Sequence, residues 1–226
     1  MEQNKKITRQ RFNTDPAFER TRENVEEFKN ASKAVKIFKG AFRDVLIVAG
    51  DNKITNRLQR EAFRVLTSDP ASDRGQRTVG KGELEILKGF NFNSRNGLGE
   101  TLFTRHTILV ERASGKVTVN FPEFVPRVRI QASPITTHFQ IVAVATAIDF
   151  ESGRFEYAVQ ESASLKWDRN PTSPLALELQ LPADSKLPIM VALAVNFEQE
   201  INSKKYPLNS ATYNAAAIVE VNAPAP

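Results

Sequence analysis

Residues 71–89, ASDRGQRTVGKGELEILKG, mark the change of pattern that decides the fold of this chain. Before this stretch, apolar residues recur at the three- and four-residue steps that are typical of helices. After it, apolar residues recur at every second position, as in strands. The glycines within residues 71–89 are typical of turns. The stretch is therefore expected to join a helical region, residues 14–80, to a β region, residues 81–226.

The helical region is expected to begin next to Asp15, which can cap a helix, with Pro16 at the first helical position. Acidic residues that follow favour the positive end of the helix dipole. The apolar stripe of this first helix comprises Phe18, Val25, Phe28, Val35, Phe38, Phe42 and Val45. The stripe predicts a helix running toward Gly50, with Asn30 and Gly40 as the points where it could divide.

A second helix is expected to follow Asp51, which can cap it, and to end at Ser68-Asp69-Pro70. Ile54, Leu58, Ala62 and Val65 share one face of this helix. The two apolar faces need a partner, so the pattern predicts a helical hairpin that packs on, or extends from, the β region.

The β region contains short alternating runs separated by Pro and Gly turns. The strand candidates are residues 107–110, 117–121, 127–131, 138–147, 154–159, 175–181, 189–197 and 215–221. This number of short strands predicts an antiparallel β-sandwich, immunoglobulin-like or similar, and the chain is expected to be α+β. Its alanine-rich runs indicate closely approaching sheets or a tight subunit contact, including edge strands for self-pairing.

The charge is divided unevenly along the chain. Residues 1–80 carry 17 Lys and Arg against 11 Asp and Glu, a net +6, whereas residues 81–226 carry 14 against 15, a net −1. Residues 1–13 are expected to form a basic, flexible arm, because Lys5, Lys6, Arg9 and Arg11 face only one acid there. Such an arm could contact an anion or a nucleic acid.

Composition limits the chemistry. The chain has no cysteine, and its histidines are His106 and His138 alone, so thiolate and histidine-rich metal sites are excluded. The chain has no GxSxG motif, so neither histidine has a serine nucleophile of that type to activate. Carboxylate pairs such as Asp149 with Glu151, or Glu156 with Glu161, keep a hydrolase open as a third hypothesis. We therefore expect a non-enzyme with no catalytic, cofactor or metal site.

No apolar run reaches the length that spans a membrane, and no secretory signal is visible, so a cytoplasmic location is expected, with export by another route left open. Basic residues at helical spacing, in particular Lys33, Lys36, Lys39 and Arg43 and then Arg57, Arg60 and Arg64, could contact phosphates. The alternative is a solvated helix face whose charges pair with nearby acids.

The leading hypothesis is a non-enzymatic structural or interaction protein that assembles with copies of itself or with a protein partner. Its expected interface residues are Phe28, Val35, Phe38, Phe42 and Trp167. Trp167 precedes a turn and could equally cap the end of the sandwich core. The alternative hypothesis is a nucleic-acid-binding protein that uses the basic arm and helices.

Residues 15–24, DPAFERTREN, resemble a block of the form DPAF-x-x-TREN found in an uncharacterised family of bacterial proteins of the Bacteroidota type. Further stretches that are similar to the family are DRGQR at 73–77, GFNF at 89–92, YPL at 206–208 and YNA at 213–215. The resemblance spans most of the chain. It implies no activity, because none is assigned to the family.

Overall fold

Side-chain caps stand at the start of α1, through Thr8, and of the 3-10 turn before α2, through Asp15. The computed structural model describes residues 8–208 and 210–224. The carboxylate of Asp15 accepts a hydrogen bond of 3.0 Å from the backbone N–H of Ala17, and Pro16 opens the short 3-10 turn that leads into the long helix α2. The helices are α1 (Arg9–Thr14), α2 (Glu19–Ala41), α3 (Arg43–Ala49), α4 (Ile54–Thr67), α5 (Leu98–Thr101), α6 (Pro126–Arg129) and α7 (Ser210–Tyr213), with 3-10 turns η1 (Pro16–Phe18), η2 (Val79–Lys81) and η3 (Leu84–Leu87).

The first helical run divides at Phe42, between α2 and α3. It does not divide at Asn30, because the side chain of Asn30 donates its hydrogen bond to the carbonyl of Arg77 instead of competing for the helix backbone. Gly40 lies inside the last turn of α2. A Cβ there would lie 2.9 Å from the ring of Phe155, so this glycine allows α2 to approach the sheet closely.

Helix α4 returns along α2 in the opposite direction. The carboxylate of Asp51 accepts a hydrogen bond from the backbone N–H of Lys53, just before α4 starts. Two side-chain contacts then link the helices, Ser32 with Gln59 at 3.3 Å and Lys39 with Thr55 at 3.1 Å. The expectation of a helix-rich N-terminal region is confirmed.

The described residues form two antiparallel sheets. The strands are β1 (Thr107–Glu111), β2 (Lys116–Phe121), β3 (His138–Ile148), β4 (Phe155–Glu161), β5 (Leu165–Lys166), β6 (Leu175–Gln180), β7 (Ile189–Ile201), β8 (Lys204–Pro207) and β9 (Ala215–Asn222). The three-stranded sheet has the order β1-β2-β6, and the six-stranded sheet is built on the path β4-β3-β7-β8, with β5 beside β3 and β9 beside β7. An antiparallel β structure in the C-terminal part is therefore confirmed.

Residues 127–131 were expected to form a strand, and this expectation is wrong. Pro126 instead starts the short helix α6, which is closed by a hydrogen bond of 2.8 Å from the N–H of Ile130 to the carbonyl of Pro126. Proline suits the first position of a helix, because its missing N–H has no partner to lose there. Only an isolated bridge between Ile130 and Leu102 remains of the expected strand.

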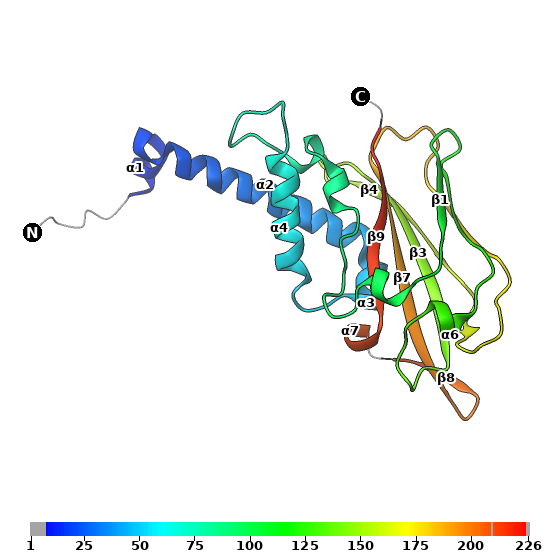
Figure 1. Ribbon diagram of the computed structural model, residues 1–226. Helices are drawn as coiled ribbons and strands as arrows, with labels where there is room; N and C mark the ends of the chain where they lie inside the picture. The colour runs from blue at the N-terminus through cyan, green and yellow to red at the C-terminus, as the bar shows by residue number, and fades with distance from the viewer. Residues whose placement is uncertain (1–7, 209, 225–226) are drawn as a thin grey trace, which may run out of the picture.

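The six-stranded sheet is covered on both faces, as Figure 1 shows for the helices on one side and β1 on the other. In β3, Val142 and Val144 pack among the helices, whereas the alternating Ala143 and Ala145 belong to the core between the two sheets. Strand β7 alternates in the same way. The alanine-rich strands are thus buried within one chain, which fits small side chains in a sheet with two covered faces.

The alanine-rich strand β9 offers no free edge for self-pairing where it runs beside residues 89–92, contrary to expectation. The N–H of Gly89 donates to the carbonyl of Ile218 at 2.7 Å, and the N–H of Phe92 donates to the carbonyl of Ala216 at 2.8 Å. A covered edge cannot pair with another strand. Within the described residues, no helix is both long and apolar enough to cross a membrane.

Candidate interaction site

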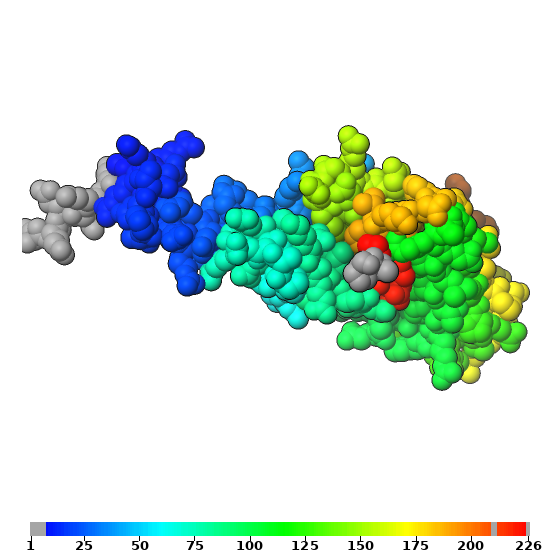
Figure 2. All heavy atoms as spheres, turned by 90° about the horizontal axis from the view of Figure 1, so that it is seen from above, coloured from blue at the N-terminus to red at the C-terminus, as the bar shows by residue number. Residues whose placement is uncertain are grey.

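The start of α2 extends beyond the rest of the molecule. Figures 1 and 2 show that α1, η1 and the first turns of α2 form a narrow projection that leaves the body at one end. We call residues Arg9–Phe28 the projecting arm. All of these residues are described, and among them Glu27 alone is buried. The arm is therefore a helical feature surrounded by solvent over most of its length.

The apolar stripe of α2 continues from the core into the projecting arm. Val35, Phe38 and Phe42 lie in the core beneath the six-stranded sheet, with at most 4% of their surface exposed. Phe28 and Val25, on the arm, are 58% and 40% exposed. The prediction that Val35, Phe38 and Phe42 form an interface is therefore wrong, because the sheet of the same chain covers these three residues. Val25 and Phe28, on the arm, are the exposed part of the stripe.

The loop of residues 69–78 clamps the base of the arm. Arg74 donates a hydrogen bond of 2.7 Å to the side chain of Asn24 and pairs with Glu23 at 3.3 Å. The buried carboxylate of Glu27 accepts a hydrogen bond from the N–H of Gly75 at 3.0 Å and pairs with Arg77 at 3.4 Å. The acids of α2 were expected only to favour the helix dipole, and their pairing with the loop brings together the stretches TREN and DRGQR, about fifty positions apart.

The tip of the arm is folded back on itself. Arg22 donates hydrogen bonds to the carbonyls of Phe12 at 2.7 Å and Asp15 at 3.0 Å. The rings of Phe12 and Phe18 pack at 5.7 Å. The hydrogen bond from the N–H of Ala17 and the guanidinium of Arg11 lower the pKa of Asp15. Helix α1 is thus held against the start of α2.

The four basic residues expected to contact an anion have different surroundings. Lys5 and Lys6 lie outside the described residues. Arg9 is exposed on α1, whereas Arg11 pairs with Asp15 at 3.1 Å and lies over the ring of Phe18. A paired guanidinium must give up its carboxylate before it can hold a phosphate, so Arg9 is the better placed of the two.

The basic stripe of α4 is also paired with acids. Arg60 and Arg64 share the carboxylate of Glu61 at 3.1 and 2.6 Å, and Arg57 binds Asp51 at 2.8 Å. Arg57 additionally donates hydrogen bonds to the backbone carbonyls of residues 91 and 92, which fixes α4 to that loop. The stripe therefore has the salt-bridged form that the sequence analysis gave as its alternative.

Trp167 caps one end of the core between the sheets. Its indole N–H donates a hydrogen bond of 3.0 Å to the carbonyl of Ile130, and the guanidinium of Arg127 lies 4.3 Å from the centre of its ring. The side chain is half-buried and packs on the core of the β region. Trp167 therefore lies half-buried on the β region, whereas Phe28 lies exposed on the arm.

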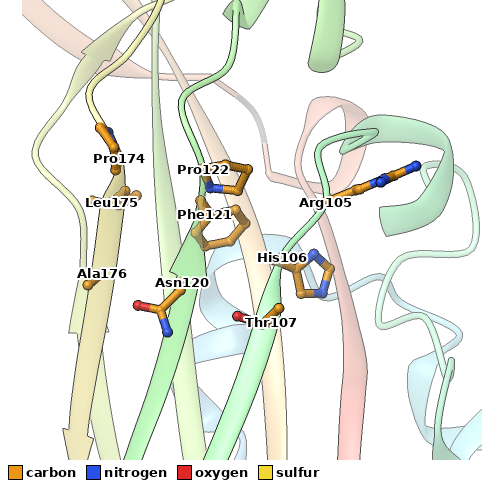
Figure 3. Close-up of a pocket in the computed structure, with 9 residues that line it drawn as sticks. All are labelled: Arg105, His106, Thr107, Asn120, Phe121, Pro122, Pro174, Leu175 and Ala176. Atoms are coloured by element: carbon orange, nitrogen blue, oxygen red, sulfur yellow. The ribbon is translucent and has the colours of Figure 1, made fainter.

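A shallow pocket at the end of the three-stranded sheet holds His106 (Figure 3). The ring of His106 packs at 5.5 Å from Phe121, and its Nδ1 atom is buried without a hydrogen-bond partner. Pro122 and Leu175 line the same pocket, which has a largely apolar surface. The residues that line it include no carboxylate, so the pocket holds no acid–base pair for hydrolysis.

The carboxylates considered for acid–base chemistry are used otherwise or lie apart. Asp149 accepts hydrogen bonds from the N–H groups of Glu151 and Ser152 and from the Ser152 hydroxyl, which lower its pKa. Glu156 and Glu161 lie five positions apart on β4, so they point to opposite faces. Residues 8–208 and 210–224 contain no group of three or more His, Asp or Glu that could hold a metal ion.

No family model matches this chain, and neither the search of curated proteins nor that of solved structures returns a significant match. What the projecting arm does must therefore be inferred from its own geometry. It combines an exposed apolar stripe, a base held by the clamp and charges of both signs.

Proposed function

We propose that this chain is a non-enzymatic interaction protein that associates with further copies of itself through the projecting arm. The observation that carries the proposal is the divided stripe of α2, in which the same face that forms the core also emerges uncovered at Val25 and Phe28. Fully burying one large apolar side chain contributes about 1.5–3 kcal/mol. A contact between two arms would bury these residues twice.

The charges of the arm support a contact between identical copies. If two arms lie antiparallel with their centres near Asn24, Glu19 of one copy is level with Lys29 of the other, which exchanges its ion pair with Glu26 of its own chain for the new one. This opposite-charge pair then occurs twice, because a two-fold contact uses the same surface on both copies. Glu19, Glu26 and Lys29 are exposed and can adjust to such a contact.

Light scattering after size exclusion tests the proposal. The variant Val25→Gln/Phe28→Gln should lower the mass of the particle toward that of a single chain and leave the far-ultraviolet circular dichroism spectrum unchanged. Ile47→Gln is the matched control, because Ile47 is 65% exposed on α3 and lies away from the arm. A wild-type monomer, or an assembly that survives the double substitution, would refute the role of the arm.

A charge exchange tests the antiparallel geometry. Glu19→Lys and Lys29→Glu should each weaken the assembly, since each places like charges opposite one another. The double variant should recover it. Equal weakening in the double variant would show that these residues do not meet across the contact.

Nucleic-acid binding through the arm and helices is the alternative proposal. Arg9 and Arg20 favour it, because both are exposed on the arm and make no ion pair with any described residue. Binding to phosphates weakens steeply as salt rises, whereas an apolar contact tolerates salt. Protein that purifies with absorbance at 260 nm and releases it in high salt, as a monomer, would favour this alternative.

For the β region, we infer an antiparallel sandwich of the immunoglobulin type or similar. The inference is supported by the core to which both sheets contribute alternating side chains, such as Val117 and Leu177 from the small sheet and Val191 from the large one. In this arrangement the sandwich is a rigid support that holds the base of the arm. A cytoplasmic location is part of the same proposal.

A further inference from the structure

A pocket lies at the seam between the helices and the six-stranded sheet. It has a volume of about 420 Å³, within the range of about 300–1,000 Å³ that is usual for small-molecule sites. Segments from α2, η2, the end of β3 with the turn that follows it, and the loop just before β7 line it. We call it the seam pocket. None of the residues proposed for self-association lines it.

The walls of the seam pocket are apolar and anchored in the core. Phe150 packs against the buried Phe38 with ring centres 5.3 Å apart. Gly80 approaches Phe150 so closely that a Cβ on this glycine would lie 3.0 Å from the Cβ of Phe150. Ile148 and Leu187 complete this apolar surface. The cavity is therefore formed by packed groups rather than by a free loop.

Three lysines line the pocket. The ammonium of Lys33 donates a hydrogen bond of 2.8 Å to the backbone carbonyl of Glu151, which draws this side chain from α2 toward the β3–β4 turn. Lys81 and Lys186 are exposed, and their side-chain ammonium groups make neither a hydrogen bond nor an ion pair with any residue in the described part of the chain. Their charges are free to bind a ligand.

Two carboxylates also line the pocket, and they offset two of the three lysine charges. Asp149 accepts hydrogen bonds from the N–H groups and the hydroxyl of its own turn, so its oxygens are directed to that turn. Glu151 is exposed, and its side chain has no partner in the described residues. Three lysines against two acids leave the lining with a net charge of +1 beside its apolar residues.

The basic pocket beside α4 shows the opposite arrangement. Each of its four cations has a carboxylate partner: Arg57 with Asp51, Arg60 and Arg64 with Glu61, and Lys88 with Glu220. An anion that enters this pocket must displace an acid of the protein, at the cost of an existing pair. The lysines of the seam pocket require no such exchange.

We propose that the seam pocket binds a small amphipathic anion. The apolar part of the ligand packs on Phe150 and Leu187, and its carboxylate or phosphate headgroup contacts Lys33, Lys81 and Lys186. Both headgroups share the chemistry of an oxyanion that lysine ammonium groups recognise as point charges. The proposal does not depend on self-association, because the pocket is formed within a single chain.

Calorimetry and thermal unfolding of the full chain test the proposal with four probes: sodium octanoate, octyl phosphate, octylamine and inorganic phosphate. The probes are used below their micelle concentrations. Octanoate or octyl phosphate should bind and raise the unfolding midpoint, because the ligand binds only the folded state. Whichever of octanoate and octyl phosphate binds more tightly identifies the preferred headgroup. Octylamine should not bind, and inorganic phosphate should bind more weakly than either amphipath.

The variant Lys81→Gln/Lys186→Gln tests the lysines. We expect it to weaken binding of the better probe by about tenfold, from the loss of two partly solvated ion contacts. Lys36→Gln/Lys204→Gln is the control, since it removes two exposed charges outside the pocket and should keep the wild-type affinity. Failure of both anionic amphipaths to bind, equal binding of octylamine, or equal loss in the two variants would each overturn the proposal.

Discussion

The side chain of Asn214 donates a hydrogen bond of 2.7 Å to the backbone carbonyl of Val48, and so joins the start of β9 to helix α3 across 166 positions of sequence. Asn214 is buried, and its amide also donates to the side chain of Asn196. Its own side-chain oxygen accepts from the N–H of Phe197. A single residue thus satisfies polar groups of the helical layer and of the sheet.

Asn214→Ala should therefore be strongly destabilising. It leaves the carbonyl of Val48 and the N–H of Phe197 buried without their partner, and each such group costs about 1–3 kcal/mol. Urea unfolding measures the loss of free energy. Asn52→Ala, at an exposed position, is the control and should stay within about 0.5 kcal/mol of the wild type. A near-neutral Asn214→Ala would show that water replaces the amide.

Glu27→Gln should loosen the clamp at the base of the arm. The substitution keeps the shape of the side chain but removes the charge that pairs with Arg77, a loss of about 1–3 kcal/mol for a buried charged contact. Limited trypsin digestion should then cleave faster after Arg74 or Arg77. Glu26→Gln removes a pair that is exposed, with Lys29, and should leave the rate unchanged. Equal rates in both variants would contradict the clamp.

Gly82→Ala should destabilise the junction between α4 and the following turn. An added Cβ would lie 1.9 Å from the carbonyl oxygen of Val65, so the backbone must move, at a cost of about 1–3 kcal/mol. Gly99→Ala in α5 is the matched control, because its Cβ would meet nothing within 4 Å and alanine favours helix by up to about 1 kcal/mol. Thermal unfolding distinguishes them, and an equal midpoint for both would refute the close approach.

Stability should fall as the pH drops below the ordinary pKa of histidine. Burial lowers the pKa of His138, and the charge of Lys205 lowers it further, against the raising effect of Glu200. Folding therefore favours the neutral imidazole, so its contribution is present above pH 6.5 and is lost as the pH falls toward the lower pKa of the folded state. Urea unfolding between about pH 7 and about pH 5.5 should show this slope, and His138→Gln should flatten it. An unchanged slope in that variant would contradict the assignment.

The stretches TREN, DRGQR, GFNF and YNA hold the layers of the fold together. TREN and DRGQR form the clamp on the arm through Glu23, Asn24 and Arg74. The stretch at 89–92 covers the edge of β9, and Asn214 joins that strand to α3. These contacts link residues far apart in sequence, so the role of each motif is visible only in the folded chain.

The sequence predicted the local structure well where the cause is local. A cap at Asp15, a proline after it and apolar residues at helical steps are sufficient for α2, and strict alternation is sufficient for β2. The expectation failed at residues 127–131, where Pro126 starts a helix within an otherwise strand-like pattern. Local preference at such short segments is easily overridden by tertiary context.

By itself, the sequence determined the long helices and strands, because backbone geometry requires a period of about 3.6 or 2 for any amphipathic element. Only the tertiary structure decided which part of each apolar face is covered. Phe38 and Phe28 belong to the same stripe, yet the sheet covers one and leaves the other in water. The tertiary structure likewise paired Arg77 with Glu27, which lies fifty positions earlier, while it left the ammonium group of Lys81 without a partner. Periodicity sets the direction of a side chain along its element, but burial and charge pairing depend on neighbours that only the folded chain supplies.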